Sequence, residues 1–122
     1  MAIVGIGVDV VDLARFSKVV YRTPGILDRL FTKAEQTGLA GKQLALVSLA
    51  GRFAVKEAVA KALGAPAGME WHDCEVSNSG APTISLRGTV AKVADSKGVT
   101  NWHVSLSHDG PVAIAYVIAE KV

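Results

Sequence analysis

The sequence predicts an α+β fold in which one long, buried helix packs on a mostly antiparallel sheet. Residues 43–63 contain no proline and only one internal glycine, and their apolar side chains lie nearly all round a helical wheel. The second half of the chain contains short β-branched segments separated by turn residues, which is typical of strands joined by hairpins. This segregation of helices and strands favours the α+β class.

The first predicted element is a buried strand over residues 3–11, which are mainly β-branched and apolar. Gly5 and Gly7 indicate either close packing of the backbone or the approach of a ligand, and the sequence leaves both open. A dinucleotide-binding loop is excluded, because the third glycine of G-x-G-x-x-G would be Val10. Asp9 must be paired, hydrogen-bonded or metal-bound, since an unpaired carboxylate among apolar residues is costly.

Helices are expected to follow this strand. Asp12 can cap a helix that runs to about residue 20, and residues 26–31 form a short helical stretch after a Thr-Pro-Gly turn. Thr32 and Glu35 have the spacing of a capping box, which predicts the start of another helix. The long helix should end at Gly64, because glycine is the residue most often found just after a helix.

The C-terminal half is expected to contain four strands and one further helix. In chain order these are strand 74–77, a turn at 78–82, strand 83–86, helix 88–96, strand 102–107, a turn at 107–110 and strand 112–118. The first two strands form one hairpin, and the last two are linked by the Ser-His-Asp-Gly turn.

Composition and charge limit the classes of function. The 122 residues are enough for one domain spanning residues 1–122. A formal charge of +2 is too small for the basic field of a nucleic-acid-binding domain, so no nucleic-acid partner is expected. The single cysteine, Cys74, excludes an internal disulfide and a zinc site built from cysteines.

The hydropathy pattern predicts a cytoplasmic protein with no membrane partner. No uncharged apolar stretch reaches the roughly 18 residues of a membrane span. The N-terminus also lacks the basic region of a signal peptide. A mean hydropathy of +0.34 is high for so small a chain, which suggests that apolar surface is buried between subunits.

Three charged residues form the candidate catalytic site. Glu57 and Lys61 are spaced i, i+4, which is also the spacing of an ordinary surface ion pair. The apolar residues around them instead favour a partly buried site. Asp9 and Glu57 are too few carboxylates for a calcium cage, but they suit Mg²⁺, which takes one or two carboxylates together with phosphates and waters. Lys61 beside them would supply positive charge to those phosphates.

Two other patterns each have a functional and a simpler interpretation. Ser107 and His108 suggest a hydrolase, but the chain has no G-x-S-x-G motif, and a histidine in a turn is more often a hydrogen-bonding group. Basic residues recur along one face of the first predicted helix, which indicates either a solvated face or a dock for an acidic partner helix. These residues are Arg15, Lys18 and Arg22, with Arg29 as an extension.

Three motifs resemble those of the holo-acyl-carrier-protein synthases. Residues 5–9 (GIGVD), with Arg15 six residues further on, resemble the first motif, and residues 52–64 (RFAVKEAVAKALG) resemble the second. Residues 104–108 (VSLSH) are similar to the closing strand motif. The resemblance covers essentially the whole chain and is nearest to actinobacterial members.

The resemblance implies a 4′-phosphopantetheinyl transferase fold and activity. Such enzymes use Mg²⁺ to move phosphopantetheine from coenzyme A to a serine of apo-acyl carrier protein, and they release adenosine 3′,5′-bisphosphate. It also implies a role in fatty acid biosynthesis and a homotrimer with active sites at the subunit interfaces. The native carrier, free-standing or part of a large synthase, stays open.

The resemblance also implies roles for individual residues. Asp9 and Glu57 match the family's Mg²⁺ ligands, and Lys61 matches the lysine that contacts the phosphates. The family's residues near coenzyme A correspond here to Arg52, Gly64, Gly80, Pro82, Ser107 and His108. Its basic positions that face the carrier's acidic helix correspond to Arg15, Lys18, Arg22 and Arg29.

Two positions depart from the family's pattern. Ala81 stands where many members have a basic residue, so that contact is missing or is supplied elsewhere, with Lys42 as a candidate. Asp109 follows His108, where other members often have Thr or Asn.

Two rival functions remain at this point. An inactive relative would bind coenzyme A without transferring its phosphopantetheine. A small oligomeric interaction protein would dock acidic partners without any need for Mg²⁺ or Asp9.

Overall fold

The computed structural model describes residues 1–38 and 44–122, and it has the α+β class that the sequence predicts. β1 (Ala2–Asp12), β5 (Val112–Lys121) and β4 (Asn101–Asp109) form an antiparallel three-stranded sheet in the order β1-β5-β4. β2 (Cys74–Ser79) and β3 (Ala81–Leu86) form a separate hairpin. The helices are α1 (Leu13–Arg22), α2 (Ile26–Leu30), α3 (Lys33–Gln36), α4 (Leu46–Ala62), the 3-10 helix η1 (Trp71–Asp73) and α5 (Gly88–Ser96).

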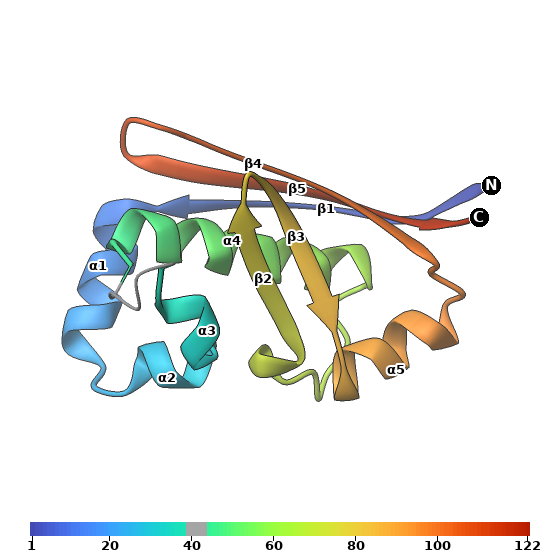
Figure 1. Cartoon of the computed structure of the whole chain (residues 1–122), viewed down its shortest axis with the longest axis horizontal. Helices are drawn as coiled ribbons and strands as arrows, with labels where there is room; N and C mark the ends of the chain where they lie inside the picture. The colour runs from blue at the N-terminus through green and yellow to red at the C-terminus, as the bar shows by residue number, and fades with distance from the viewer. Residues whose placement is uncertain (39–43) are drawn as a thin grey trace.

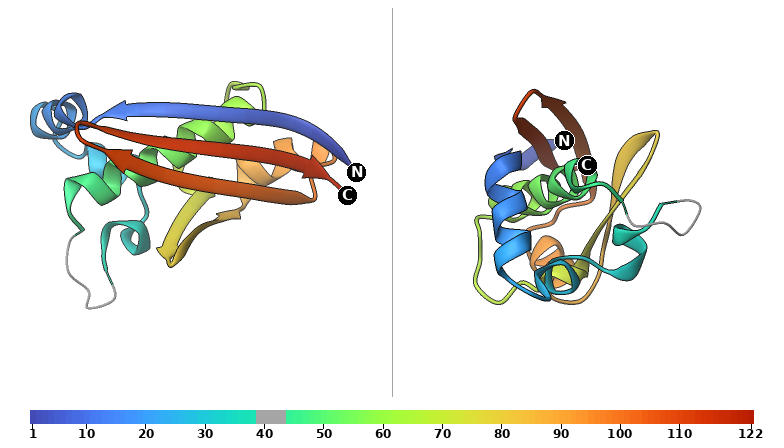
Figure 2. Two further views of the ribbon diagram at one scale, coloured as in Figure 1. Left: turned by 90° about the horizontal axis from the view of Figure 1, so that it is seen from above. Right: turned by 90° about the vertical axis from the view of Figure 1, so that its left-hand side faces the viewer.

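Helix α4 is the centre of the molecule. It runs beneath the three-stranded sheet, and the β2–β3 hairpin and the shorter helices lie on its other sides (Figures 1 and 2). Most of its side chains are buried, which confirms the expectation from its nearly uniform apolar pattern. The helix begins at Leu46, whereas the predicted start at Gln43 lies outside the described residues. It ends as predicted, with Gly64 at φ 83° just beyond it.

The two glycines of β1 are explained by close packing on α4. A Cβ atom at Gly5 would lie 1.9 Å from the backbone oxygen of Ala62, and one at Gly7 would lie 1.8 Å from that of Ala58. No side chain fits at either position, so the strand and helix backbones are in contact there. This contact places Asp9, two residues after Gly7, beside the C-terminal half of α4.

The two faces of the three-stranded sheet differ. Ala115 and Val117 on β5 face α4 and are buried. The other face exposes large apolar side chains from β1 and β5, namely Ile6, Val8, Val10, Ile114 and Tyr116. The sheet therefore carries an uncovered apolar face. Within residues 1–38 and 44–122, no helix has the length and apolar character needed to cross a membrane.

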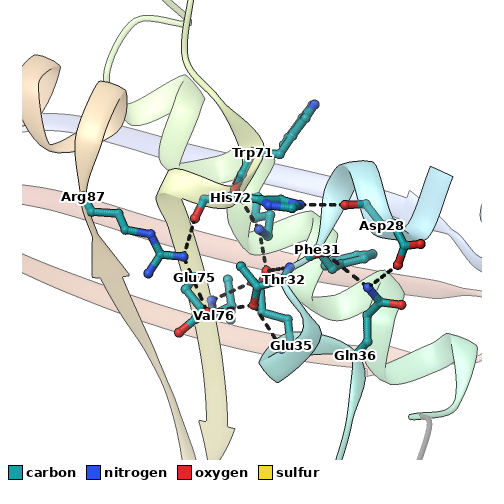
Figure 3. A network of polar contacts seen from close by, with 11 residues as sticks. Asp28, Phe31, Thr32, Glu35, Gln36, Trp71, His72, Glu75, Val76 and Arg87 are labelled. Carbon is teal, nitrogen blue, oxygen red and sulfur yellow. Dashed lines mark hydrogen bonds and ion pairs between the residues drawn. The ribbon is translucent and has the colours of Figure 1, made fainter. Parts of the chain in front are cut away.

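A buried polar network joins α4 to α3, η1 and β2 (Figure 3). Lys56 Nζ lies 2.8 Å from Glu35 Oε1, and the two side chains are 1% and 0% exposed. The same amine donates to the backbone oxygen of Trp71 at 2.8 Å, and Glu35 Oε2 accepts from Val76 N at 2.8 Å. Thr32 and Glu35 also form the predicted capping box. The burial of this pair was not predicted.

Both turns between paired strands are tighter than predicted. The β2–β3 turn centres on Gly80 at φ 96°, and Asn78 already pairs with Pro82. The expected turn at 107–110 is wrong, because the β4–β5 register continues through His108 and Asp109. The chain reverses at Gly110, which has φ 54° and is followed by Pro111. His108 is therefore a strand residue.

Candidate active site

The site is built around an ion pair between β1 and α4. Lys61 Nζ donates to Asp9 Oδ1 at 2.8 Å and to the backbone oxygen of Val8 at 3.0 Å. The Asp9 side chain is only 14% exposed, whereas that of Lys61 is 48% exposed. The amine satisfies a carboxylate that would otherwise be costly among apolar residues. The expected i, i+4 neighbour of Lys61 was Glu57, but its hydrogen-bonded partner is Asp9.

Glu57 is the second carboxylate of the site. Its pKa lies above the ordinary value, first because the group is partly buried, then because Asp9 repels its charge, while Lys61 offsets part of the effect. Since Asp9 contributes to this shift, the two carboxylates lie close enough to interact. A cation bound between them would relieve the repulsion.

The two carboxylates of Asp9 and Glu57 suit a magnesium ion, which needs few protein ligands, better than a metal ion coordinated only by protein side chains. Within the described part of the chain, no three His, Cys, Asp or Glu side chains gather as metal ligands. Two carboxylates leave the remaining positions to waters and substrate phosphates, as Mg²⁺ prefers. Asp9 and Glu57 are the residues that could hold the ion.

Glu57 and Trp71 line two cavities that meet at the site. The first, of about 310 Å³, is also lined by Asp9, Arg15 and the apolar face of α1. The second, of about 290 Å³, is mainly apolar and includes Cys74. Burial raises the pKa of the Cys74 thiol to about 12, so this group is not a nucleophile at neutral pH. Glu57 therefore borders two cavities, one with charged residues and one that is mainly apolar.

A second group of predicted residues gathers elsewhere. Arg52 and Asn78 line a cavity of about 500 Å³, and Asn78 and His108 line a neighbouring one of about 100 Å³. Among the described residues, neither cavity shares a lining residue with the two at Glu57. Within one chain, the coenzyme A candidates Arg52 and His108 are thus grouped apart from Asp9, Glu57 and Lys61.

Arg52 is an unusual member of this second group. The residue is 9% exposed, and its Nε has no hydrogen-bond partner within residues 1–38 and 44–122. Burial lowers its pKa, an effect that Glu35 partly offsets. A buried donor without a partner is rare in proteins, and this one belongs to a residue that lines the cavity of about 500 Å³.

The remaining predicted residues lie at the surface around these groups. Gly64 and Gly80 are exposed with positive φ, Pro82 lies on β3 opposite Asn78, and Ser107 is exposed on β4. Ala81 and Asp109, the two departures from the family pattern, are also exposed. Lys42 lies outside the described residues.

The basic residues are exposed along the start of the fold. Arg15, Lys18 and Arg22 lie on α1, and Arg29 lies on α2. Arg15 also lines the cavity that contains Asp9 and Glu57. The basic face of α1 therefore begins at the candidate catalytic site.

Sequence reasoning missed Trp71 and Asn78. Trp71 precedes a predicted strand without any motif around it, and Asn78 lies in the predicted turn at 78–82. The hairpin register offered a signal for Asn78, because a residue paired with Pro82 shares its environment. No local signal marked Trp71.

The chain is similar over nearly its whole length to proteins of one group. The 4′-phosphopantetheinyl transferase superfamily matches residues 5–117. A holo-[acyl-carrier-protein] synthase of Arthrobacter sp. (strain FB24) is 58% identical over 119 residues, which cover 97% of this chain and 98% of the relative. The crystal structure of the Neisseria meningitidis synthase has a TM-score of 0.86 at 26% identity, covering 98% of this chain and 100% of that one. The Helicobacter pylori synthase, solved in complex with coenzyme A, has a TM-score of 0.77 at 32% identity, with coverages of 94% and 99%.

Proposed function

The chain belongs to the holo-[acyl-carrier-protein] synthases of the 4′-phosphopantetheinyl transferase superfamily, and from this membership we propose its reaction in detail. It transfers 4′-phosphopantetheine from coenzyme A to a serine of an apo-acyl carrier protein and releases adenosine 3′,5′-bisphosphate. The reaction depends on Mg²⁺ and serves fatty acid biosynthesis in the cytoplasm. The observation that carries this proposal is the meeting of Asp9, Glu57 and Lys61 beside two cavities.

Each charged residue has a role in this reaction. Asp9 and Glu57 would hold Mg²⁺, which would supply positive charge to neutralise the pyrophosphate of coenzyme A. Lys61, already aimed at Asp9, turns its amine toward the phosphates and stabilises the charge that develops on the leaving bisphosphate. Most of the rate enhancement comes from positioning and charge neutralisation, as in other phosphoryl transfers.

The transfer itself exchanges one phosphorus–oxygen bond for another. The carrier's serine Oγ attacks the phosphorus that bears pantetheine, and the bond from that phosphorus to the leaving adenosine bisphosphate breaks. The serine proton passes to Glu57 or to a water beside it.

We place the complete active site between subunits of a homotrimer. The exposed apolar face of β1 and β5 supports burial against another copy of the chain. The separation of Arg52 and His108 from Asp9 and Glu57 within one chain also supports it, because one subunit then supplies the coenzyme A contacts and its neighbour the metal ligands. Light scattering during gel filtration tests the trimer, and a monomeric mass at assay concentrations would contradict it.

Intact mass spectrometry of an apo-acyl carrier protein tests the reaction. Incubation with the protein, coenzyme A and Mg²⁺ is expected to add one phosphopantetheine group, and EDTA should abolish the gain. Asp9→Asn and Glu57→Gln are expected to lower the rate by about 100-fold or more while the fold stays intact. Asp95→Asn, on the exposed surface of α5, is the matched control and should retain full activity.

The outcomes separate the rival functions. No gain on a free-standing carrier calls for a carrier domain from a large synthase. No gain on either, with coenzyme A still bound, would identify an inactive binding module. Gain that persists in Asp9→Asn at saturating Mg²⁺ would overturn the metal assignment.

A further inference from the structure

Trp71 connects the buried polar network to the candidate active site. Its backbone oxygen accepts from Lys56 Nζ at 2.8 Å, and the residue lines both cavities at Glu57. Figure 3 shows the Trp71 side chain pointing away from the network that holds its carbonyl. The backbone of Trp71 thus belongs to the buried polar network, whereas its side chain points away from that network.

The ring of Trp71 packs over the face of α4 that carries Glu57. Its centroid lies 5.4 Å from that of Phe53, at an interplanar angle of 41°. Phe53 precedes Glu57 by four residues, so the two side chains lie on the same face of the helix. The position of the Trp71 ring therefore determines the shape of the space on both sides of Glu57.

The Lys56–Glu35 ion pair fixes the backbone of Trp71. Lys56 comes from α4 and Glu35 from α3, and Glu35 also accepts from Val76 N on β2 and Thr32 N before α3. Every one of these contacts is 2.8 to 2.9 Å long. An ion pair buried this completely is weak evidence for stability, because desolvation of the two charges offsets their attraction. The Lys56–Glu35 pair is better explained by the position in which it holds the backbone of η1.

We propose that Trp71 is a substrate-positioning residue of the Glu57 site, and that the buried Lys56–Glu35 pair holds it in place. The ring lies where the cavity beside the basic face of α1 meets the mainly apolar one. It therefore borders both of the cavities that Glu57 lines. This inference rests on the proposed role of Glu57.

Steady-state kinetics test the role of the ring. Trp71→Ala is expected to raise KM for coenzyme A or for the carrier by about five-fold or more, with a smaller change in kcat. Trp71→Phe should restore most of the wild-type KM, since it keeps an aromatic ring against Phe53. A KM within about two-fold of wild type for both substrates in Trp71→Ala would overturn the proposal.

A second variant tests the ion pair. Single substitutions would leave one buried charge unpaired and could prevent folding. The double variant Glu35→Gln/Lys56→Met removes both charges and is expected to reproduce the KM effect of Trp71→Ala. Val99→Ala, which truncates a buried side chain outside the four cavities described, is the control for lost stability. If the double variant behaved like Val99→Ala, the pair would be merely structural.

Fluorescence gives a readout that does not need activity. The chain has two tryptophans, so Trp102→Phe leaves Trp71 as the reporter. Coenzyme A with Mg²⁺ should change the Trp71 emission saturably, and the double variant should make the ring more accessible to acrylamide. Unchanged emission and quenching would contradict the inference. Failure of the proposed function is distinct, because it would appear as absence of carrier modification by the wild-type protein.

Discussion

Lys61 Nζ lies 2.8 Å from Asp9 Oδ1, so the last turn of the long helix is tied to the first strand at the candidate metal site. In the free protein the amine therefore contacts a carboxylate that the proposed Mg²⁺ would also bind. The metal ion would compete with Lys61 for the charge of Asp9, and an amine released from this pair could contact a phosphate. In the free protein this ion pair keeps the Lys61 amine and the Asp9 carboxylate together at the candidate site.

Replacing Lys61 with methionine should separate these two roles. Lys61→Met is expected to lower kcat by about 100-fold, because a positive charge near the leaving group is lost. The free protein should at the same time bind Mg²⁺ more tightly, since Asp9 is no longer paired. Steady-state kinetics and titration calorimetry measure the two effects, with Lys92→Met on α5 as the control. A change confined to KM would reduce Lys61 to a substrate-binding residue.

Charge reversal on α1 should weaken carrier binding. Arg22→Glu removes one exposed positive charge from the basic face without altering the lining of the Asp9 cavity. We expect the carrier's KM to rise by about ten-fold at low ionic strength and to depend less on salt than in the wild type. Lys92→Glu makes the same change of charge on α5 and should have little effect. An unchanged salt dependence in Arg22→Glu would contradict the docking role.

A methyl group at Gly7 should disrupt the packing of β1 on α4. Gly7→Ala would place Cβ 1.8 Å from the backbone oxygen of Ala58, so the strand must move off the helix. We expect the free energy of unfolding to fall by about 3 kcal/mol or more, or the chain not to fold. The control Gly25→Ala has open space around its Cβ but a φ of 80°, and should cost about 1–2 kcal/mol. Urea unfolding measures the free energy of unfolding of both variants. An equal decrease in Gly7→Ala and Gly25→Ala would contradict the packing argument.

These glycines illustrate what the sequence could and could not predict. The pattern of α4 indicated burial on most sides, because a helix with apolar residues all round would otherwise expose apolar side chains to water. The capping box at Thr32 and Glu35 was predictable from local spacing alone. Whether Gly5 and Gly7 served packing or a ligand depended on a helix some 50 residues away, and no local pattern reports that contact.

The same limit applies to the site. Asp9, Glu57 and Lys61 were predicted from their residue types and surroundings as well as from motifs that resemble a known family, and the structure brings them together. Trp71 was not predicted, since its role depends on Lys56 and Glu35 from two other elements. The predicted turn at 107–110 is wrong because the pairing of two long strands continues through Asp109, although that residue is turn-prone.

A carboxylate from η1 holds the start of α5. Asp73 Oδ2 accepts from Thr89 N at 2.8 Å and from Thr89 Oγ1 at 2.7 Å. These two hydrogen bonds, the side-chain one first, lower the pKa of Asp73 below its ordinary value of 3.8. The ionised carboxylate is therefore favoured in the folded state. Its contribution to stability is present above the unfolded pKa and is lost as pH falls through the lowered folded pKa.

Asp73→Asn should accordingly reduce stability at neutral pH but not in acid. Asparagine retains an acceptor but not the charge, so the variant is expected to unfold at lower urea than the wild type at about pH 7. The difference should shrink as pH falls below about 4, because the wild-type carboxylate then becomes protonated as well. Asp95→Asn removes the same charge near the other end of α5 and should show no such loss at neutral pH. A deficit in Asp73→Asn that stayed constant from neutral pH into acid would show that geometry, rather than ionisation, makes this cap effective.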